Sequence, residues 1–301
     1  NIIAEKISTQ IKKIKPKKPS LNILDAGLGD GTLLMSVLRN CHHEFPTIPF
    51  LVYGKEISME DVRLSTEKLP DRFIEHPNMI FVASNLYYSE IASLNSSNPV
   101  KQQHIKWDIL KLKGNSSFEF NQQLSQLDTM LQNNWQVERH PTSGNPTYKS
   151  PSVLIIYRKD HEFSLDHIIP KQDGAKNYFD LIIASQPYRS RISVQKKVDY
   201  VVKPMIQALA SGGKLILVHA FGNDSGSEII QKVWPELLEK LILEVNKEYK
   251  CFEGSVFKQS FFEEYLVHKK IDWPRTETGK LDLKDETFKE KAIQYPELED
   301  L

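Results

Sequence analysis

A glycine-rich turn between a strand and a helix is the feature of this sequence that most restricts its fold. The turn reads Asp25-Ala26-Gly27-Leu28-Gly29-Asp30-Gly31. The apolar run Leu21–Leu24 before it is typical of a buried strand, and Thr32–Arg39 after it has the pattern of a helix. Glycines let the backbone bend sharply and let a ligand approach with no Cβ in the way. In an open α/β sheet, such a turn is expected at the carboxyl ends of the strands, where ligands bind.

Strands and helices alternate through most of the chain. The predicted helices are Ile2–Ile14, Met59–Leu69, Val198–Leu209 and Glu228–Val245, and the further strands are Phe50–Tyr53, Ile80–Ala83, Phe179–Ala184 and Lys214–His219. Ser211–Gly213 is predicted as a turn, and Tyr249–Glu253 with Glu264–His268 as a closing antiparallel pair. This alternation predicts an α/β fold that is doubly wound, with a mostly parallel sheet and helices on both faces.

The alternation breaks after the third strand. Residues 89–178 are polar and rich in Asn and Gln, and Val153–Tyr157 is their one convincing strand. Segments this long between regular elements are usually functional or disordered, so we expect an insertion that packs over the main sheet as a substrate lid. The expected organisation is a core in two parts, 1–88 and 179–271, the insertion 89–178, and a charged C-terminal tail, 272–301.

Composition restricts the class of protein and its setting. The 301 residues are 40% hydrophobic and 26% charged, which is enough to bury a core, and the formal net charge is zero. Charge balance disfavours tight nucleic-acid binding without excluding a local basic patch. Cys41 and Cys251 stand far apart, so we expect no disulfide framework, no metal site and a cytoplasmic location. No apolar run approaches the roughly 20 residues that span a bilayer, so no membrane partner is expected.

Two acids help to select the ligand of the glycine turn. The third glycine is Gly31, whereas a dinucleotide-binding GxGxxG turn would require a glycine at the position of Thr32. Asp25 ends the strand before the turn, where a carboxylate would repel a pyrophosphate but would suit an ammonium or sulfonium group. Glu56 follows the second strand, and an acid there can accept hydrogen bonds from ribose hydroxyls.

This ordered set resembles the class I S-adenosylmethionine (SAM)-dependent methyltransferases over roughly Leu21–Asn85 and Phe179–His268. The resemblance implies a seven-stranded Rossmann-like sheet and SAM as cofactor. It places Glu56 at the ribose-binding acid and Ser84-Asn85 at the adenine-binding position, although the family usually has Asp where this chain has Asn85. The implied cofactor-binding residues are Asp25, Gly27, Gly29, Asp30, Gly31, Glu56, Ile57, Ser84, Asn85 and Ala184.

The residues after the fourth predicted strand are the candidates for chemistry. Ser185-Gln186-Pro187-Tyr188 is similar to the turn of amino-directed methyltransferases, which have Asn, Asp or Ser, a variable residue, Pro and an aromatic. An oxygen there would accept hydrogens of a planar amine, proline would stiffen the turn, and Tyr188 would stack on the substrate. Arg189 and Arg191 could bind a substrate carboxylate or phosphate, or could simply be solvated.

One histidine of the insertion, His161, is a candidate general base because its pKa lies near neutrality, although histidines on polar loops are usually ordinary surface residues. We therefore predict that Ser185, Pro187, Tyr188 and His161 serve catalysis and that Tyr188, Arg189 and Arg191 bind substrate.

The predicted reaction is methyl transfer from SAM to a nitrogen or oxygen of an unidentified acceptor, with a small molecule favoured. Three alternatives stay open: an RNA or protein amine methyltransferase, an aminopropyltransferase, and a catalytically inactive SAM-binding scaffold. An aminopropyltransferase should carry acids after the fourth strand to bind a polyamine, whereas this chain has Ser185-Gln186-Pro187-Tyr188. The sequence does not indicate an oligomeric state.

Overall fold

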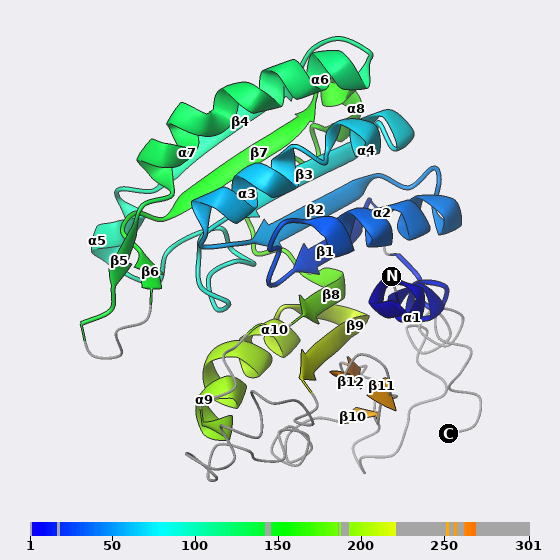
Figure 1. Ribbon diagram of the computed structural model, residues 1–301, viewed down its shortest axis with the longest axis vertical. Coiled ribbons are helices and arrows are strands. Elements are labelled where there is room, and N and C mark those ends of the chain that lie inside the picture. The colour runs from blue at the N-terminus through cyan, green and yellow to red at the C-terminus, as the bar shows by residue number, and fades with distance from the viewer. Residues whose placement is uncertain are drawn as a thin grey trace, which may run out of the picture.

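One large β-sheet organises the computed structural model of the chain (Figure 1). The structure describes residues 2–16, 19–141, 146–185, 187, 193–220, 251–252, 256–257 and 262–268. Five parallel strands lie side by side in the order β3-β2-β1-β8-β9. They are β1 (Leu21–Asp25), β2 (Phe50–Lys55), β3 (Met79–Ser84), β8 (Phe179–Ser185) and β9 (Leu209–Ala220). The strand order reverses between β1 and β8, so the topological switch point lies beside the glycine turn, as in other doubly wound sheets.

One end of the sheet closes as predicted. Strand β12 (Phe262–His268) pairs antiparallel with β9, and β10 (Cys251–Phe252) pairs antiparallel with β12. The short strand β11 (Val256–Phe257) also pairs with β12. The eight strands described in the two core segments therefore form the mostly parallel sheet expected from the sequence, with the short β11 in addition to the seven strands expected. Residues 211–213, predicted as a turn, lie within β9, where the pairing with β8 shifts register and Gly212 takes a φ of 77°.

The insertion extends the other end of the sheet. Strand β7 (Ser152–Arg158) pairs antiparallel with β3, and β4 (Lys106–Leu112) pairs parallel with β7. The prediction that the insertion packs over the sheet is therefore wrong for these two strands, which lie in its plane. Strand β4 was missed because it is an edge strand with several half-exposed side chains, so its sequence lacks the apolar run of a buried strand. A separate hairpin joins β5 (Val137–Arg139) to β6 (Pro146–Tyr148).

One face of the sheet is covered by six helices among the described residues. They are α1 (Ile2–Ile11), α2 (Thr32–Glu44), α3 (Met59–Thr66), α4 (Pro70–Glu75), α6 (Ser117–Leu124) and α7 (Asp128–Asn134), and the short 3₁₀ turn η1 (Ser125–Leu127) links the last two (Figure 1). Alternate strand residues such as Val52 and Phe81 pack against these helices in one cluster. The predicted helix 59–69 is α3, which ends at Thr66, and Pro70 begins the next helix, a position that proline favours.

The opposite face carries a second cluster, built on the other set of alternating residues, such as Tyr53 and Val82. It is covered by residues 86–94 and by α8 (Glu162–Leu165), α9 (Val194–Lys197), the π-helical turn η3 (Val198–Val202) and α10 (Lys203–Gln207). The remaining short helices are α5 (Pro99–Gln102) and η2 (Lys159–His161). Each large apolar side chain buried in either cluster contributes roughly 1.5–3 kcal/mol. The predicted helix 228–245 lies outside the described residues, and no helix within them is long and apolar enough to cross a bilayer.

Candidate functional site

The glycine turn lies at the carboxyl edge of the sheet and is tied to both neighbouring strands. The Ala26 amide donates to the carbonyl of Ile183 in β8 at 2.8 Å, and the Leu28 amide donates to the carbonyl of Lys55 in β2 at 3.1 Å. Gly54 makes room for the turn, because a Cβ at Gly54 would lie 2.8 Å from the Leu28 side chain. The turn is therefore held in place over the switch point.

Two glycines of the turn adopt left-handed backbone conformations. The φ angle is 50° at Gly29 and 77° at Gly31, a region in which residues with a Cβ are strained. A Cβ on Gly31 would also lie 2.8 Å from the Cβ of Ser65 in α3. A Cβ on Gly29 would meet nothing within 4 Å. Gly31 is thus needed for packing, whereas the space next to Gly29 is open to a ligand.

Asp25 is a buried acid at this edge of the sheet. Its side chain is 1% exposed, and Oδ1 accepts a hydrogen bond from the Gly27 amide at 3.2 Å. The other oxygen, Oδ2, is buried without a hydrogen-bond partner. Burial raises the pKa of Asp25 to about 7; the Gly27 hydrogen bond opposes this rise, and the negative charge of Glu56 adds to it. A buried acceptor without a donor is costly, so Asp25 is suited to a cationic donor brought by a ligand.

Glu56 connects the glycine turn to the start of α3. Its Oε1 accepts from the amides of Ile57 at 2.7 Å and Ser58 at 2.9 Å, and its Oε2 accepts from the Gly29 amide at 3.0 Å. A carboxylate offers about four acceptor positions, so Oε2 keeps one for a ligand hydroxyl. Ile57, half-buried, lies in this link. The sequence did not indicate the role of Trp135, whose indole donates to the Glu56 carbonyl at 3.0 Å and fixes the link from the insertion.

The side chains of Ser84 and Asn85 are occupied by the insertion. The Asn85 amide group donates to the Ser150 carbonyl at 3.0 Å and accepts from the Ser152 amide at 2.8 Å, while the Ser84 hydroxyl donates to the Ser152 carbonyl at 2.8 Å. Both side chains are at most 2% exposed. This geometry does not support the predicted adenine-binding role. The reason is that antiparallel β7 begins beside the end of β3 and uses these polar groups to satisfy its own backbone.

Two other predicted cofactor residues have their side chains engaged by the protein itself. The Asp30 carboxylate accepts from the Thr32 amide at 3.0 Å and pairs with Lys68 at 2.6 Å. The Lys68 and Thr32 hydrogen bonds lower the pKa of Asp30 to about 2, so it is an anchored acid at the start of α2. Ala184 is fully buried in the cluster beneath α9 and α10, so its methyl group is part of the core.

The predicted acceptor turn begins where β8 ends. Ser185 is the last residue of β8 and is half-buried, and Pro187 is close to it. The hydroxyl of Tyr88 donates to the Pro187 carbonyl at 2.8 Å, and the ammonium of Lys55 lies 4.6 Å from the centroid of the Tyr88 ring. Sequence reasoning stopped at Asn85 and missed this pair, although Lys55 precedes Glu56 directly and Tyr88 follows β3 closely. Gln186, Tyr188, Arg189 and Arg191 lie outside the described residues.

His161 lies at the other edge of the sheet. It follows β7, which runs antiparallel to β3, and its Nδ1 is 2.7 Å from the side-chain oxygen of Asn78, just before β3 begins. A strand the length of β3 spans about 20 Å, which separates His161 from Asp25 and Ser185. The antiparallel direction of β7 therefore keeps His161 apart from the other candidates. The sequence did not indicate this direction, so it did not reveal the separation.

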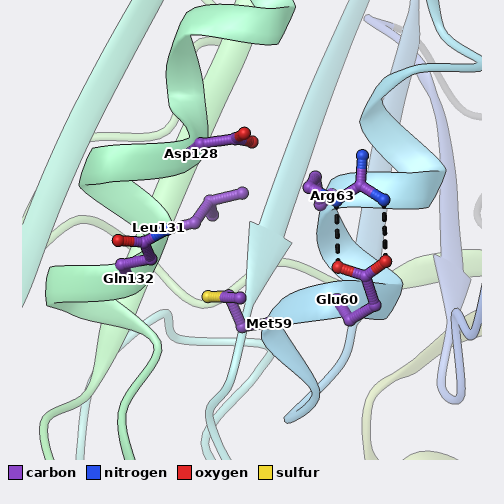
Figure 2. Close-up of a pocket in the computed structure, with 6 residues that line it drawn as sticks. All are labelled: Met59, Glu60, Arg63, Asp128, Leu131 and Gln132. Atoms are coloured by element: carbon purple, nitrogen blue, oxygen red, sulfur yellow. Dashed lines mark hydrogen bonds and ion pairs between the residues drawn. The ribbon is translucent and has the colours of Figure 1, made fainter.

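A small pocket of about 170 Å³ lies between α3 and α7, just beyond the Glu56 link. Figure 2 shows the residues that line it: Met59, Glu60 and Arg63 from α3, and Asp128, Leu131 and Gln132 from α7. Arg63 is paired with Glu60 at 2.7 Å and also with Glu67. Its charge is thus already compensated. No polar side-chain atom of these six residues is buried without a hydrogen-bond partner, as Asp25 Oδ2 is. Within the described ranges, no cluster of three or more His, Cys, Asp or Glu side chains could hold a metal ion.

Comparison with known proteins yields distant matches. No protein-family profile matches the chain. The chain is 28% identical over 168 residues to the DNA polymerase delta catalytic subunit of Plasmodium falciparum, a match that covers 50% of this chain but only 15% of the polymerase. A match that spans so little of the polymerase does not show that the matched part carries its activity.

Among solved structures, similar chains include the N-methyltransferase NodS from Bradyrhizobium japonicum, with 9% identity, 90% of this chain and 98% of NodS covered, and a TM-score of 0.39. An rRNA methylase from Streptococcus thermophilus has 10% identity, coverages of 89% and 97%, and a TM-score of 0.38. The rRNA methyltransferase AviRa from Streptomyces viridochromogenes has 13% identity, coverages of 88% and 83%, and a TM-score of 0.37. The function of this chain therefore has to be inferred from its own residues.

Proposed function

We propose that the chain is a SAM-dependent methyltransferase whose cofactor site is the open side of the glycine turn. The observation that carries the proposal is the unpartnered Oδ2 of Asp25, buried beneath the turn beside the switch point. Of the polar groups described at this edge, it is the one whose burial calls for a cationic donor. A pyrophosphate would bring more negative charge to it, whereas the ammonium of an amino-acid-like cofactor would supply the missing hydrogen bond.

The neighbouring groups fit the rest of such a cofactor. Asp25 would hold the ammonium, the free acceptor position on Glu56 Oε2 would hold a ribose hydroxyl, and the open space at Gly29 would admit the cofactor without steric conflict. When bound, SAM supplies an electrophilic methyl group on its sulfonium. Because that group is already activated, the residues of the chain need only hold the acceptor, exclude water and accept its hydrogens.

The acceptor side of the site is formed by the end of β8. The Ser185 hydroxyl and the backbone oxygens of this turn are acceptors for the hydrogens of an amine or a hydroxyl group. We propose a nitrogen or oxygen nucleophile on a small molecule. The zero net charge of the chain argues against a broad phosphate-binding surface.

Calorimetry with SAM and with its demethylated product, S-adenosylhomocysteine, tests the cofactor site. Asp25→Asn and Glu56→Gln should each weaken binding at least tenfold, since each removes a charged acceptor. Asp30→Asn is the matched control, because its carboxylate faces Lys68 and Thr32, and its affinity should stay within twofold of the wild type. Equal affinity in all three variants would refute this placement of the site.

Labelled SAM tests the reaction. The purified chain is incubated with methyl-labelled SAM and with separate small-molecule, RNA and protein fractions of a cell extract. Label in the small-molecule fraction is the expected result. Label in RNA or protein would refute the proposal of a small-molecule acceptor. Tight binding of SAM with no transfer to any fraction would indicate a binding scaffold instead of an enzyme.

A further inference from the structure

The side chain of Tyr88 connects the edge of β3 to the acceptor turn after β8. Its hydroxyl donates to the Pro187 carbonyl at 2.8 Å, a contact between residues 99 positions apart in the sequence. Because β2 and β1 lie between β3 and β8 in the sheet, this contact passes over the carboxyl edge of the strands that carry Glu56 and Asp25. Tyr88 therefore joins the two sides of the proposed site.

The Tyr88 ring has two kinds of contact. It packs against the apolar cluster beneath residues 86–94, and the Lys55 ammonium lies over its face, 4.6 Å from the ring centroid. A cation over an aromatic face is attracted by the negative charge of the ring π-system. Lys55 follows Gly54 at the end of β2, the strand that also braces the glycine turn, so the ring is fixed relative to that turn.

The electrostatic surroundings keep the Tyr88 hydroxyl a donor. Burial raises the pKa of Tyr88, and the negative charges of Glu56 and Asp25 raise it further. The same two acids that are proposed to bind the cofactor thus lie within electrostatic range of this hydroxyl. The hydroxyl stays protonated at and well above neutral pH, so it keeps the hydrogen that it donates to the Pro187 carbonyl.

We propose that Tyr88 is a positioning residue that, with Lys55 against its ring, holds Pro187, and with it Ser185 at the end of β8, at a fixed place relative to Asp25 and Glu56. This rests on the proposed function, because the turn matters only if an acceptor binds there. Tyr88 does not react; it sets where the acceptor oxygens of the turn lie with respect to the methyl donor. A turn held in this way reduces the conformations that must be lost when the acceptor is aligned.

Hydrogen exchange measured by mass spectrometry on the full chain tests whether the contact holds the backbone around Pro187, because the amides next to this proline exchange when that backbone opens. Tyr88→Phe keeps the ring and removes only the hydroxyl, so the peptide containing Ser185 and Pro187 should exchange about fivefold faster, the equivalent of one hydrogen bond. Tyr87→Phe is the matched control, since that neighbouring hydroxyl contacts Thr147 instead, and should leave this peptide unchanged. Lys55→Met should speed exchange in the same peptide. Lys55→Arg keeps the cation, so its exchange rate should equal that of the wild type.

Cofactor binding and transfer separate positioning from general loss of structure. Tyr88→Phe should bind SAM within twofold of the wild type, keep its thermal midpoint, and transfer label to the accepting fraction several-fold more slowly at saturating SAM. Unchanged exchange in the turn, or a fall in SAM affinity as large as the fall in transfer rate, would overturn the role of Tyr88. A wild-type chain that binds no SAM would overturn the proposed function, and this role with it.

Discussion

Replacing Asp25 with asparagine should change how the stability of the ligand-free chain depends on pH. The pKa of Asp25 is about 7 in the folded chain and near its ordinary value of 3.8 when unfolded. The folded state therefore binds this proton more tightly, so Asp25 makes folding progressively less favourable as pH rises from about 4 through 7. At 1.36 kcal/mol per pKa unit, the loss between pH 5 and pH 8 is about 2.5 kcal/mol. Asparagine cannot ionise, so Asp25→Asn should lack this loss.

Urea unfolding at pH 5, 6, 7 and 8 measures the effect as a difference between variant and wild type, in which the other titrating groups cancel. Relative to wild type, Asp25→Asn should gain stability steadily across this range. Asp30→Asn is the control, because the pKa of Asp30 is lowered to about 2 by Lys68 and Thr32 and its titration lies below the range. If Asp25→Asn and wild type show the same pH dependence, Asp25 is already ionised at pH 5 and the argument from its unpartnered oxygen is wrong.

Three further results are expected. SAM should bind roughly eightfold more tightly at pH 7.5 than at pH 6, because Asp25 must lose its proton to accept from the ammonium, and flat calorimetric affinities would contradict this. Gly31→Ala should cost more free energy of unfolding than Gly29→Ala: both suffer the left-handed backbone penalty of about 1–2 kcal/mol, but a Cβ at Gly31 also meets Ser65. Equal losses of unfolding free energy in urea would show that Ser65 moves aside at no cost. His161→Gln should change SAM affinity and methyl transfer less than twofold, and a tenfold fall in transfer would return His161 to the site.

The parts of the fold that depend on local pattern were predicted from the sequence. The apolar run of β1, the glycine turn and the start of α2 follow one another within a dozen residues, so the position of Asp25 at a strand end could be inferred directly. The antiparallel pairing of segments 249–253 and 264–268 was also predicted, and β10 and β12 pair in this way. Periodicity and glycine placement are properties of neighbouring residues and can be read without knowing the tertiary structure.

The parts that depend on long-range pairing could not be predicted. Asn85 has the position expected of an adenine-binding residue, yet its side chain serves Ser150 and Ser152, more than sixty positions away. Likewise, His161 is misplaced because its strand runs antiparallel to β3, and Tyr88 was missed because its partner is Pro187. Strand direction and register are set by packing of the whole sheet, so side chains used at these joints are indistinguishable in sequence from side chains free to bind a ligand.

The pairing of β7 with β3 also determines how far the protein can be shortened. Without β7, the outer side of β3 would lose its hydrogen-bonding partner from Ile80 to Ser84. A row of bare amides and carbonyls on so apolar a strand is a template for pairing with other chains. A chain that lacked β7 would therefore precipitate or assemble edge to edge, so the inserted segment protects the edge of the core sheet from aggregation as well as adding to its surface.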